Sequence, residues 1–188
     1  LDSASKEVFS DSYTFNDETY SVERGPFVGC ENLKTVTFQK GTNQIAENLF
    51  AGAVSLEEIT IPDTVTTIEE SAFMDCLRLS KVTMPDTVTR IDLSAFENCI
   101  SLKNIDLSDS LKSMGSRAFG YTALESVVIP KSMDFASVQV FNDAYEFNGE
   151  SFGVDRGPFV CCENLKTVTF EDGIKAIPEN ILAGAVAV

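Results

Sequence analysis

The sequence predicts an α/β-type repeat solenoid dominated by short β-strands, in which turns of 23 residues stack on one another. The first observation is a register of phenylalanines that follow one another at intervals of 23, namely Phe27, Phe50, Phe73, Phe96 and Phe119. The second is the pattern around them, A-F-x-x-C-x-x-L-x-x-I-x-I-P-x-x-V-x-x-I. The third is that one turn cannot bury all these apolar side chains by itself, so neighbouring turns must cover them.

Each turn contains two short extended pieces separated by a proline. In the turn after Phe50, Ile59 and Ile61 are two residues apart and share one face of a short strand. Pro62 ends that strand, because proline cannot donate to a ladder. A second extended piece follows at 65–68, and a helical or 3₁₀ turn is then expected to bring the next Phe back across the far side. We expect one sheet strand per turn, with all the strands parallel.

The outward positions of the predicted sheet carry polar residues, including a column of threonines. Two interpretations are open. Threonine suits an exposed strand position through its β-propensity alone, whereas a polar sheet is also a surface on which a partner docks. The candidate protein-binding residues on this face are Thr37, Glu58, Thr60, Lys81, Thr83, Asn104 and Asp106.

A second, longer repeat is superimposed on the first. Residues 8–54 align without a gap with residues 140–186, at a constant offset of 132. The next Phe of the register after Phe119 is Phe159, which is 40 residues further on and therefore 17 more than one turn. The chain thus divides into a hairpin-containing N-terminal segment, tandem repeats, a hairpin insert and resumed repeats. These are residues 1–26, 27–130, 131–158 and 159–188.

The insert contains a strong β-hairpin signal. Asn148-Gly149 lies between alternating aromatic residues, and Asn-Gly is the preferred pair of a two-residue hairpin turn. Its N-terminal copy has Asn16-Asp17, which predicts a looser turn. The aromatic side chains either pack on the flank of the solenoid as a spacer or protrude to meet a partner. The candidate binding residues of the hairpin are Tyr145, Phe147 and Phe152.

Charge and hydropathy limit the possible partners. The formal net charge is −15 and the pI is near 4.3, which disfavours nucleic acid and anionic lipid. No apolar run is long enough to span a membrane, and no signal peptide is visible. The chain begins at Leu1 and stops within the apolar run 183–188, so we interpret it as a piece of a longer protein. An uncovered apolar end is expected to associate end to end or to fray.

Catalytic chemistry is not expected. The chain has no histidine, which removes Ser-His and Cys-His pairs, His-ligated metals and the commonest general base. Asp106 and Asp109 are the nearest thing to a calcium pair and lack the loop spacing. No phosphate-binding or nucleophile motif is present, so we predict no enzyme, no cofactor and no metal.

The cysteines follow the repeat. Cys30, Cys76, Cys99 and Cys162 lie three residues after a register Phe, which predicts an inward-facing ladder of small apolar side chains. Parallel in-register thiols are held further apart than a disulfide prefers, so free, buried thiols are expected. Cys161 takes the place of Gly29 and is the candidate exposed, reactive thiol.

The repeat resembles the BspA-like family of leucine-rich repeats, written I-P-x-x-V-x-x-I-x-x-x-A-F-x-x-C-x-x-L. Residues 61–79 match this pattern position by position, and residues 84–102 match it again. The chain departs from it at Leu49, which replaces Ala, and after Phe119, where the Cys is missing and the spacing is one residue short. The resemblance implies a right-handed leucine-rich-repeat superhelix with one parallel strand per 23-residue turn.

The resemblance also implies a function class. Similar proteins lie on the surface of, or are secreted by, mucosal and gut bacteria and some protists, and several are implicated in adhesion. We therefore expect a non-enzymatic binding domain of an extracellular or cell-surface protein. Its partner would be a protein or glycan on host or neighbouring cells. The alternative is a structural spacer of a larger repeat protein, without a ligand of its own.

Overall fold

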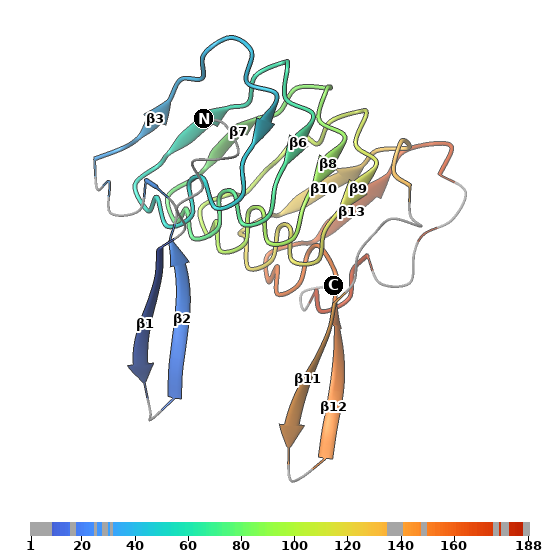
Figure 1. Ribbon diagram of the computed structural model, residues 1–188. Helices are drawn as coiled ribbons and strands as arrows, with labels where there is room; N and C mark the ends of the chain where they lie inside the picture. The colour runs from blue at the N-terminus through green and yellow to red at the C-terminus, as the bar shows by residue number, and fades with distance from the viewer. Residues whose placement is uncertain are drawn as a thin grey trace.

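The protein is a coil of stacked turns from which two β-hairpins extend, as the computed structural model shows (Figure 1). The structure describes residues 9–15, 18–24, 26–27, 30, 32–134, 141–147, 150–174, 177 and 181–185, with the backbone only in the hairpin strands. The described turns form a parallel β-solenoid with about 23 residues per turn, as the sequence predicts.

Parallel strands run along two sides of the coil. On the first side, β3, β5 and β7 form one sheet, and β10 pairs with β13 in another. Their bounds are β3 Thr35–Val36, β5 Glu58–Thr60, β7 Lys81–Thr83, β10 Ser126–Ile129 and β13 Thr167–Phe170. On the second side, the order is β4-β6-β8-β9. Their bounds are β4 Gln44–Ile45, β6 Thr67–Ile68, β8 Arg90–Ile91 and β9 Ser113–Met114.

The prediction of one strand per turn is therefore wrong, because the second extended piece also pairs with its neighbours. Register partners are 23 residues apart on both sides between β3 and β9, for example Ile59 with Val82 and Ile68 with Ile91. Across the insert, partners of β10 and β13 are 41 residues apart, as Ser126 and Thr167 are. The first side is interrupted at residues 103–106, which form no strand. The ladder resumes there, since the N–H of Glu125 donates to the carbonyl of Lys103 at 3.0 Å.

The far side of the coil contains no helical turn among the described residues, so that prediction is wrong as well. From Phe50 to Phe119, the residues two before and two after each register Phe have positive φ, with Ser71 at 52° and Asp75 at 60° around Phe73. A helix needs consecutive right-handed residues, and these left-handed ones stop it. The backbone bonds to the next turn instead, the N–H of Phe73 donating to the carbonyl of Ala95 at 2.8 Å.

The phenylalanine register forms a continuous stack through the core. Ring centroids of successive residues lie 5.0–5.7 Å apart from Phe27 to Phe159, and Phe96 lies within 2° of parallel to Phe119. Phe73, Phe96, Phe119 and Phe159 are fully buried. The rings are the largest buried side chains, and aromatic side chains contribute most to a core per residue. The ladder therefore joins the turns into one core.

The thiols confirm most of the predicted cysteine ladder. All five cysteines are free, and Cys76, Cys99 and Cys162 are buried. Each of these thiols donates to the carbonyl of a Phe in the preceding turn, as Cys76 does to Phe50 at 3.2 Å. Cys30 is exposed, contrary to the prediction. It lies in the first turn of the described coil, where no described turn stacks on its outer side.

Hairpin β11–β12 interrupts the coil without disturbing the stacking, and hairpin β1–β2 precedes the coil. Hairpin β11 (Phe141–Phe147) to β12 (Glu150–Arg156) confirms the signal around the Asn-Gly pair, and β1 (Phe9–Phe15) to β2 (Glu18–Arg24) is its N-terminal copy. The turn residues of both hairpins lie outside the described residues. After β12 the coil resumes, because Phe119 donates its N–H to the carbonyl of Pro158 at 2.8 Å.

Candidate functional site

The structure places all the predicted sheet residues on one exposed face. Alternation along each strand decides this, because Ile59 and Val82 point into the core while their neighbours point outward. Glu58 lies opposite Lys81, and Thr60 lies opposite Thr83. The exposed candidates are Thr37, Glu58, Thr60, Lys81, Thr83, Asn104 and Asp106.

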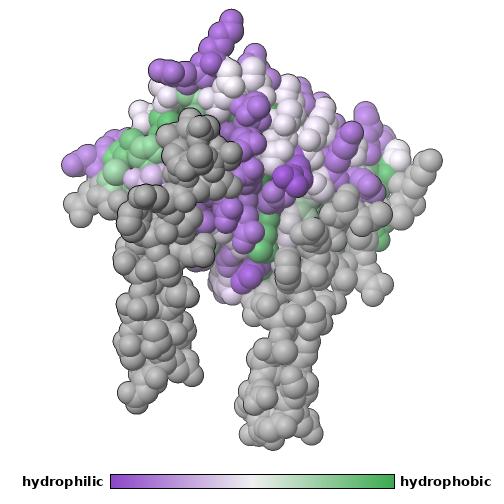
Figure 2. Space-filling view, in the orientation of Figure 1, coloured by the Kyte–Doolittle hydropathy of each residue, from purple (hydrophilic) through white to green (hydrophobic). Residues whose placement is uncertain are grey.

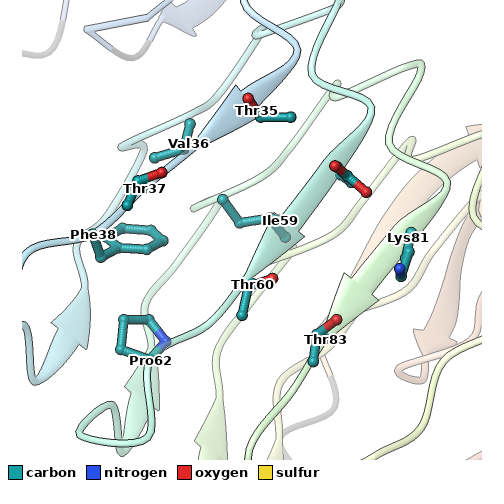
Figure 3. Close-up of a pocket in the computed structure, with 10 residues that line it drawn as sticks. Thr35, Val36, Thr37, Phe38, Ile59, Thr60, Pro62, Lys81 and Thr83 are labelled. Carbon is teal, nitrogen blue, oxygen red and sulfur yellow. The ribbon is translucent and has the colours of Figure 1, made fainter.

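Two adjoining hollows collect these residues. The first, of about 640 Å³, lies over β3, β5 and β7, and Figure 3 shows the threonine and lysine side chains that line it. The second, of about 440 Å³, lies between β7 and residues 104–106, where the sheet is interrupted. Lys81 and Thr83 line both hollows. The hollows therefore join into one shallow groove, which we call the sheet groove.

The sheet groove also contains apolar residues that the sequence analysis did not single out. Phe38 and Pro62 line the first hollow, and Met84 lines the second. These residues lie at the ends of the strands on the first side of the coil. Phe38 and Met84 take the Ile position of the Ile-Pro pair in the repeat template, and Pro62 takes the Pro position. That inward position was assigned to the core, yet Phe38 and Met84 are only half-buried. The groove thus combines hydroxyl, charged and apolar groups, as protein-binding surfaces commonly do.

The charge of this face differs from that of the whole chain. Outward positions on the first side carry four lysines and four carboxylates, so their sum is zero, whereas the chain has 14 basic and 29 acidic residues and a net charge of −15. The lysines are Lys34, Lys81, Lys103 and Lys166, and the carboxylates are Glu57, Glu58, Asp106 and Glu125. Lys34 and Glu57 form an exposed ion pair at 2.9 Å, which contributes little to stability. The face therefore does not repel an acidic partner as the rest of the chain does.

The hairpin candidates occupy paired positions. Tyr145 lies opposite Phe152, and Phe147 lies opposite Glu150. Their side chains lie outside the described residues. The backbone of the hairpin extends away from the coil (Figure 1).

The buried thiols have no nucleophilic character. Burial raises the pKa of the Cys76 thiol to about 12, and burial also raises the pKa values of Cys99 and Cys162. These groups stay protonated at neutral pH, and a protonated thiol is a poor nucleophile. Cys161 is half-buried and adopts a φ of 53°, in a place where other turns have Asp75 or Asn98.

The described residues form neither a metal centre nor a membrane-spanning helix. Across the described part of the chain, no group of three or more acidic or cysteine side chains is arranged to hold a metal ion. No helix within that part is long and apolar enough to cross a membrane.

A second surface feature was missed by the sequence analysis. Val54, Leu77 and Ile100 lie four residues after successive register phenylalanines and are 37%, 37% and 55% exposed. A hollow of about 310 Å³ adjoins this apolar column and is lined by Ile100 and Tyr121 among others. The periodicity was visible, but the template treats this position as variable, so it gave no signal.

Comparison with known proteins decides the family. The family model described as the BspA type leucine rich repeat region matches six copies, which span residues 20–148 and 66–186. The chain belongs to the BspA-type leucine-rich repeat family. Among proteins with curated descriptions, none matches it.

Solved structures share the fold of this BspA-type chain. A leucine-rich repeat protein from Bacteroides ovatus is 24% identical, with a TM-score of 0.56 over 88% of this chain and 41% of its own. The T. pallidum leucine-rich repeat protein is 21% identical, with a TM-score of 0.58 over 86% and 79%. A leucine-rich cell surface protein from Faecalibacterium prausnitzii is 25% identical, with a TM-score of 0.51 over 90% and 48%. The BspA-type chain thus spans less than half of the Bacteroides and Faecalibacterium proteins.

Proposed function

We propose that this chain is a non-enzymatic protein-binding module of a cell-surface or secreted protein, and that the sheet groove docks the partner. The observation that carries the proposal is the sheet groove itself. It gathers hydroxyl and amide groups with one lysine and two carboxylates, on a face whose outward positions together carry zero net charge, within a chain of net charge −15. Neutrality there removes a long-range repulsion that the rest of the surface imposes on acidic partners.

The family supports the location and the class of partner. The similar protein from Faecalibacterium prausnitzii is described as a cell surface protein. A stack of short turns exposes a long continuous face, which repeat proteins use to bind other proteins. We extend the proposal to adhesion, with a protein or glycan on host or neighbouring cells as the partner.

The test compares two double variants of the same chain. Thr60→Arg with Thr83→Arg fills the sheet groove, while Thr64→Arg with Thr87→Arg places the same change, at the same spacing, in the turns after the strands. The chain is immobilised and probed with fibronectin, with fibrinogen and with whole bacterial cells. We expect the groove variant to lose at least tenfold in affinity and the control to stay within twofold. Equal losses in both would refute the groove as the site.

A structural spacer is the second candidate, and the 132-residue repeat supports it, since residues 8–54 recur as residues 140–186. If the chain is a spacer, neither the chain nor a longer protein that contains it binds any of these probes. It also predicts a distinct domain beyond the repeats in the parent sequence. Binding that depends on Thr60 and Thr83 would exclude it.

A further inference from the structure

A shortened turn creates a hollow next to the apolar column. Leu102 follows its register Phe by six residues, whereas Leu124 follows Phe119 by only five. The place that Asn164 fills in the next turn therefore has no counterpart after Phe119. The hollow of about 310 Å³ lies at this turn, between the turn before it and the turn after it.

The hollow is rich in hydrogen-bond acceptors. Its wall in the preceding turn includes Asn98 and Ile100, and its wall in the following turn includes Glu163 and Asn164. Tyr121, which is 39% exposed, lies between the two walls. None of the described residues that line the hollow is basic. The hollow thus offers amide oxygens, one carboxylate and an aromatic ring.

These groups complement a cation with several N–H donors. The side chain of Asn98 donates from Nδ2 to Oδ1 of Asp75 at 2.8 Å, so its amide oxygen is the group that it offers to a ligand. A guanidinium carries five N–H donors in one plane and no acceptor. Its plane also stacks on aromatic faces such as that of Tyr121, through a cation–π interaction. An arginine side chain therefore matches both the acceptors and the ring.

Tyr121 occupies a backbone position that suits other residues better. Its φ is 57°, and the equivalent residues of the three preceding turns, which also have positive φ, are Gly52, Asp75 and Asn98. Glycine, Asp and Asn tolerate this conformation, whereas it is an outlier for a bulky side chain. Strained residues concentrate at binding sites, where their function offsets the cost. Tyr121 is therefore the residue of this turn that we expect to contact a ligand.

The surroundings of the hollow indicate that the basic group belongs to a protein. The outward positions of the first side sum to zero, so the net charge of −15 is carried by the rest of the chain, and that field attracts cationic partners. The apolar column of Val54, Leu77 and Ile100 adjoins the hollow. Figure 2 shows hydrophilic residues over much of the visible face of the coil, with hydrophobic ones gathered in a few small areas. Contiguous exposed apolar residues mark protein contacts.

We propose that the hollow at Tyr121 binds an arginine side chain of a partner protein, whose neighbouring aliphatic residues cover the apolar column. The guanidinium lies over the ring of Tyr121 and donates to the oxygens of Asn98 and Glu163. A volume of 310 Å³ is at the lower end of ligand pockets, which span about 300–1,000 Å³, so the hollow accommodates one side chain. The site lies outside the sheet groove, so its test is independent of Thr60 and Thr83.

The test titrates the chain with the capped dipeptide acetyl-Leu-Arg-amide and follows backbone amide signals by NMR. The amides of Tyr121, Ala123 and Glu163 are expected to shift with a single dissociation constant. The citrulline analogue has the same shape without the charge and is expected to bind about fivefold more weakly. Glu163→Gln is expected to weaken binding of the arginine probe about threefold. Glu125→Gln removes the same charge from an exposed residue that does not line the hollow and is expected to leave the dissociation constant unchanged.

Tyr121→Asn separates binding from folding. Asparagine already occupies this place in the preceding turn, as Asn98 with a φ of 61°. The variant is therefore expected to keep its thermal midpoint and to bind the arginine probe about threefold more weakly.

Four results would overturn the proposal. The first is that no amide at the hollow shifts with the arginine probe, and the second is that the citrulline analogue binds as tightly. The third is that Glu125→Gln weakens binding as much as Glu163→Gln, because the general field of the chain would then explain the attraction. The fourth is that methyl glucoside or methyl galactoside shifts the same amides more strongly, because the hollow would then be a sugar site.

Discussion

The phenylalanine stack makes a quantitative prediction about stability. Phe96 is fully buried and stacks on Phe73 at 5.0 Å and on Phe119 at 5.3 Å. Truncation of a buried Phe costs about 3–5 kcal/mol, and part of that is the loss of two ring pairs worth about 0.5–1.5 kcal/mol each. We therefore expect Phe96→Ala to lower the free energy of unfolding by about 4 kcal/mol.

Phe27→Ala is the matched control at the end of the stack. Phe27 is half-buried and stacks on Phe50 at 5.1 Å, so the same truncation removes one ring pair and less buried area. We expect it to cost about 2 kcal/mol, roughly half the value in the centre. Urea unfolding followed by circular dichroism measures both. Equal losses in the two variants, or a loss below about 1 kcal/mol for Phe96→Ala, would refute the idea that the stack joins the turns.

Three further predictions concern the thiols and one glycine. Thiol labelling of the folded chain is expected to modify two cysteines, Cys30 and Cys161, and all five after unfolding; labelling of a third in the folded state would contradict the buried ladder. The pKa of the Cys76 thiol rises from 9.0 in the unfolded chain to about 12 in the folded chain. The protonated thiol therefore stabilises the folded chain fully below pH 9, and this stabilisation is lost as pH rises toward 12. The free energy of unfolding falls by at most about 1.4 kcal/mol per pH unit in this range. Urea midpoints between pH 8 and pH 10.5 should therefore fall less steeply in Cys76→Ala, and equal slopes would contradict this assignment. A Cβ at Gly115 would lie 2.3 Å from the backbone nitrogen of Leu93, so Gly115→Ala is expected to lower the thermal midpoint at a cost of about 1–3 kcal/mol, and an unchanged midpoint would show that the turns can separate.

The sequence predicted the features that depend on period. The 23-residue register predicted the Phe ladder and the inward thiols, because a residue that recurs once per turn stacks on the equivalent residue of the next turn. Alternation around Ile59 placed the outward residues of the sheet groove. The Asn-Gly pair located a hairpin, because that pair fits few other backbone turns. Whether these residues bind a partner stays a prediction.

Other features were decided by contacts between turns, which the order of residues does not reveal. Ser71 and Ser94 adopt left-handed φ values of 52° and 55°, a conformation that disfavours most L-residues by roughly 1–2 kcal/mol. The stack tolerates them because their N–H groups donate to the next turn. The pattern within one turn therefore predicts a helix, whereas in the structure the carbonyls that accept these N–H groups belong to the neighbouring turn.

For the solenoid as a whole, the sequence period determined some features and contacts between turns decided the others. By itself the sequence determined the length of a turn, the residues that fill its interior and the residues that face outward, since all three follow from periodicity. Only the tertiary structure decided the path of the far side, the exposure of Cys30 and the interruption of the sheet at residues 103–106, which line the second hollow of the sheet groove. Each of these depends on whether a neighbouring turn is present and how closely it approaches, because backbone groups bond to whichever partner stacking brings within reach.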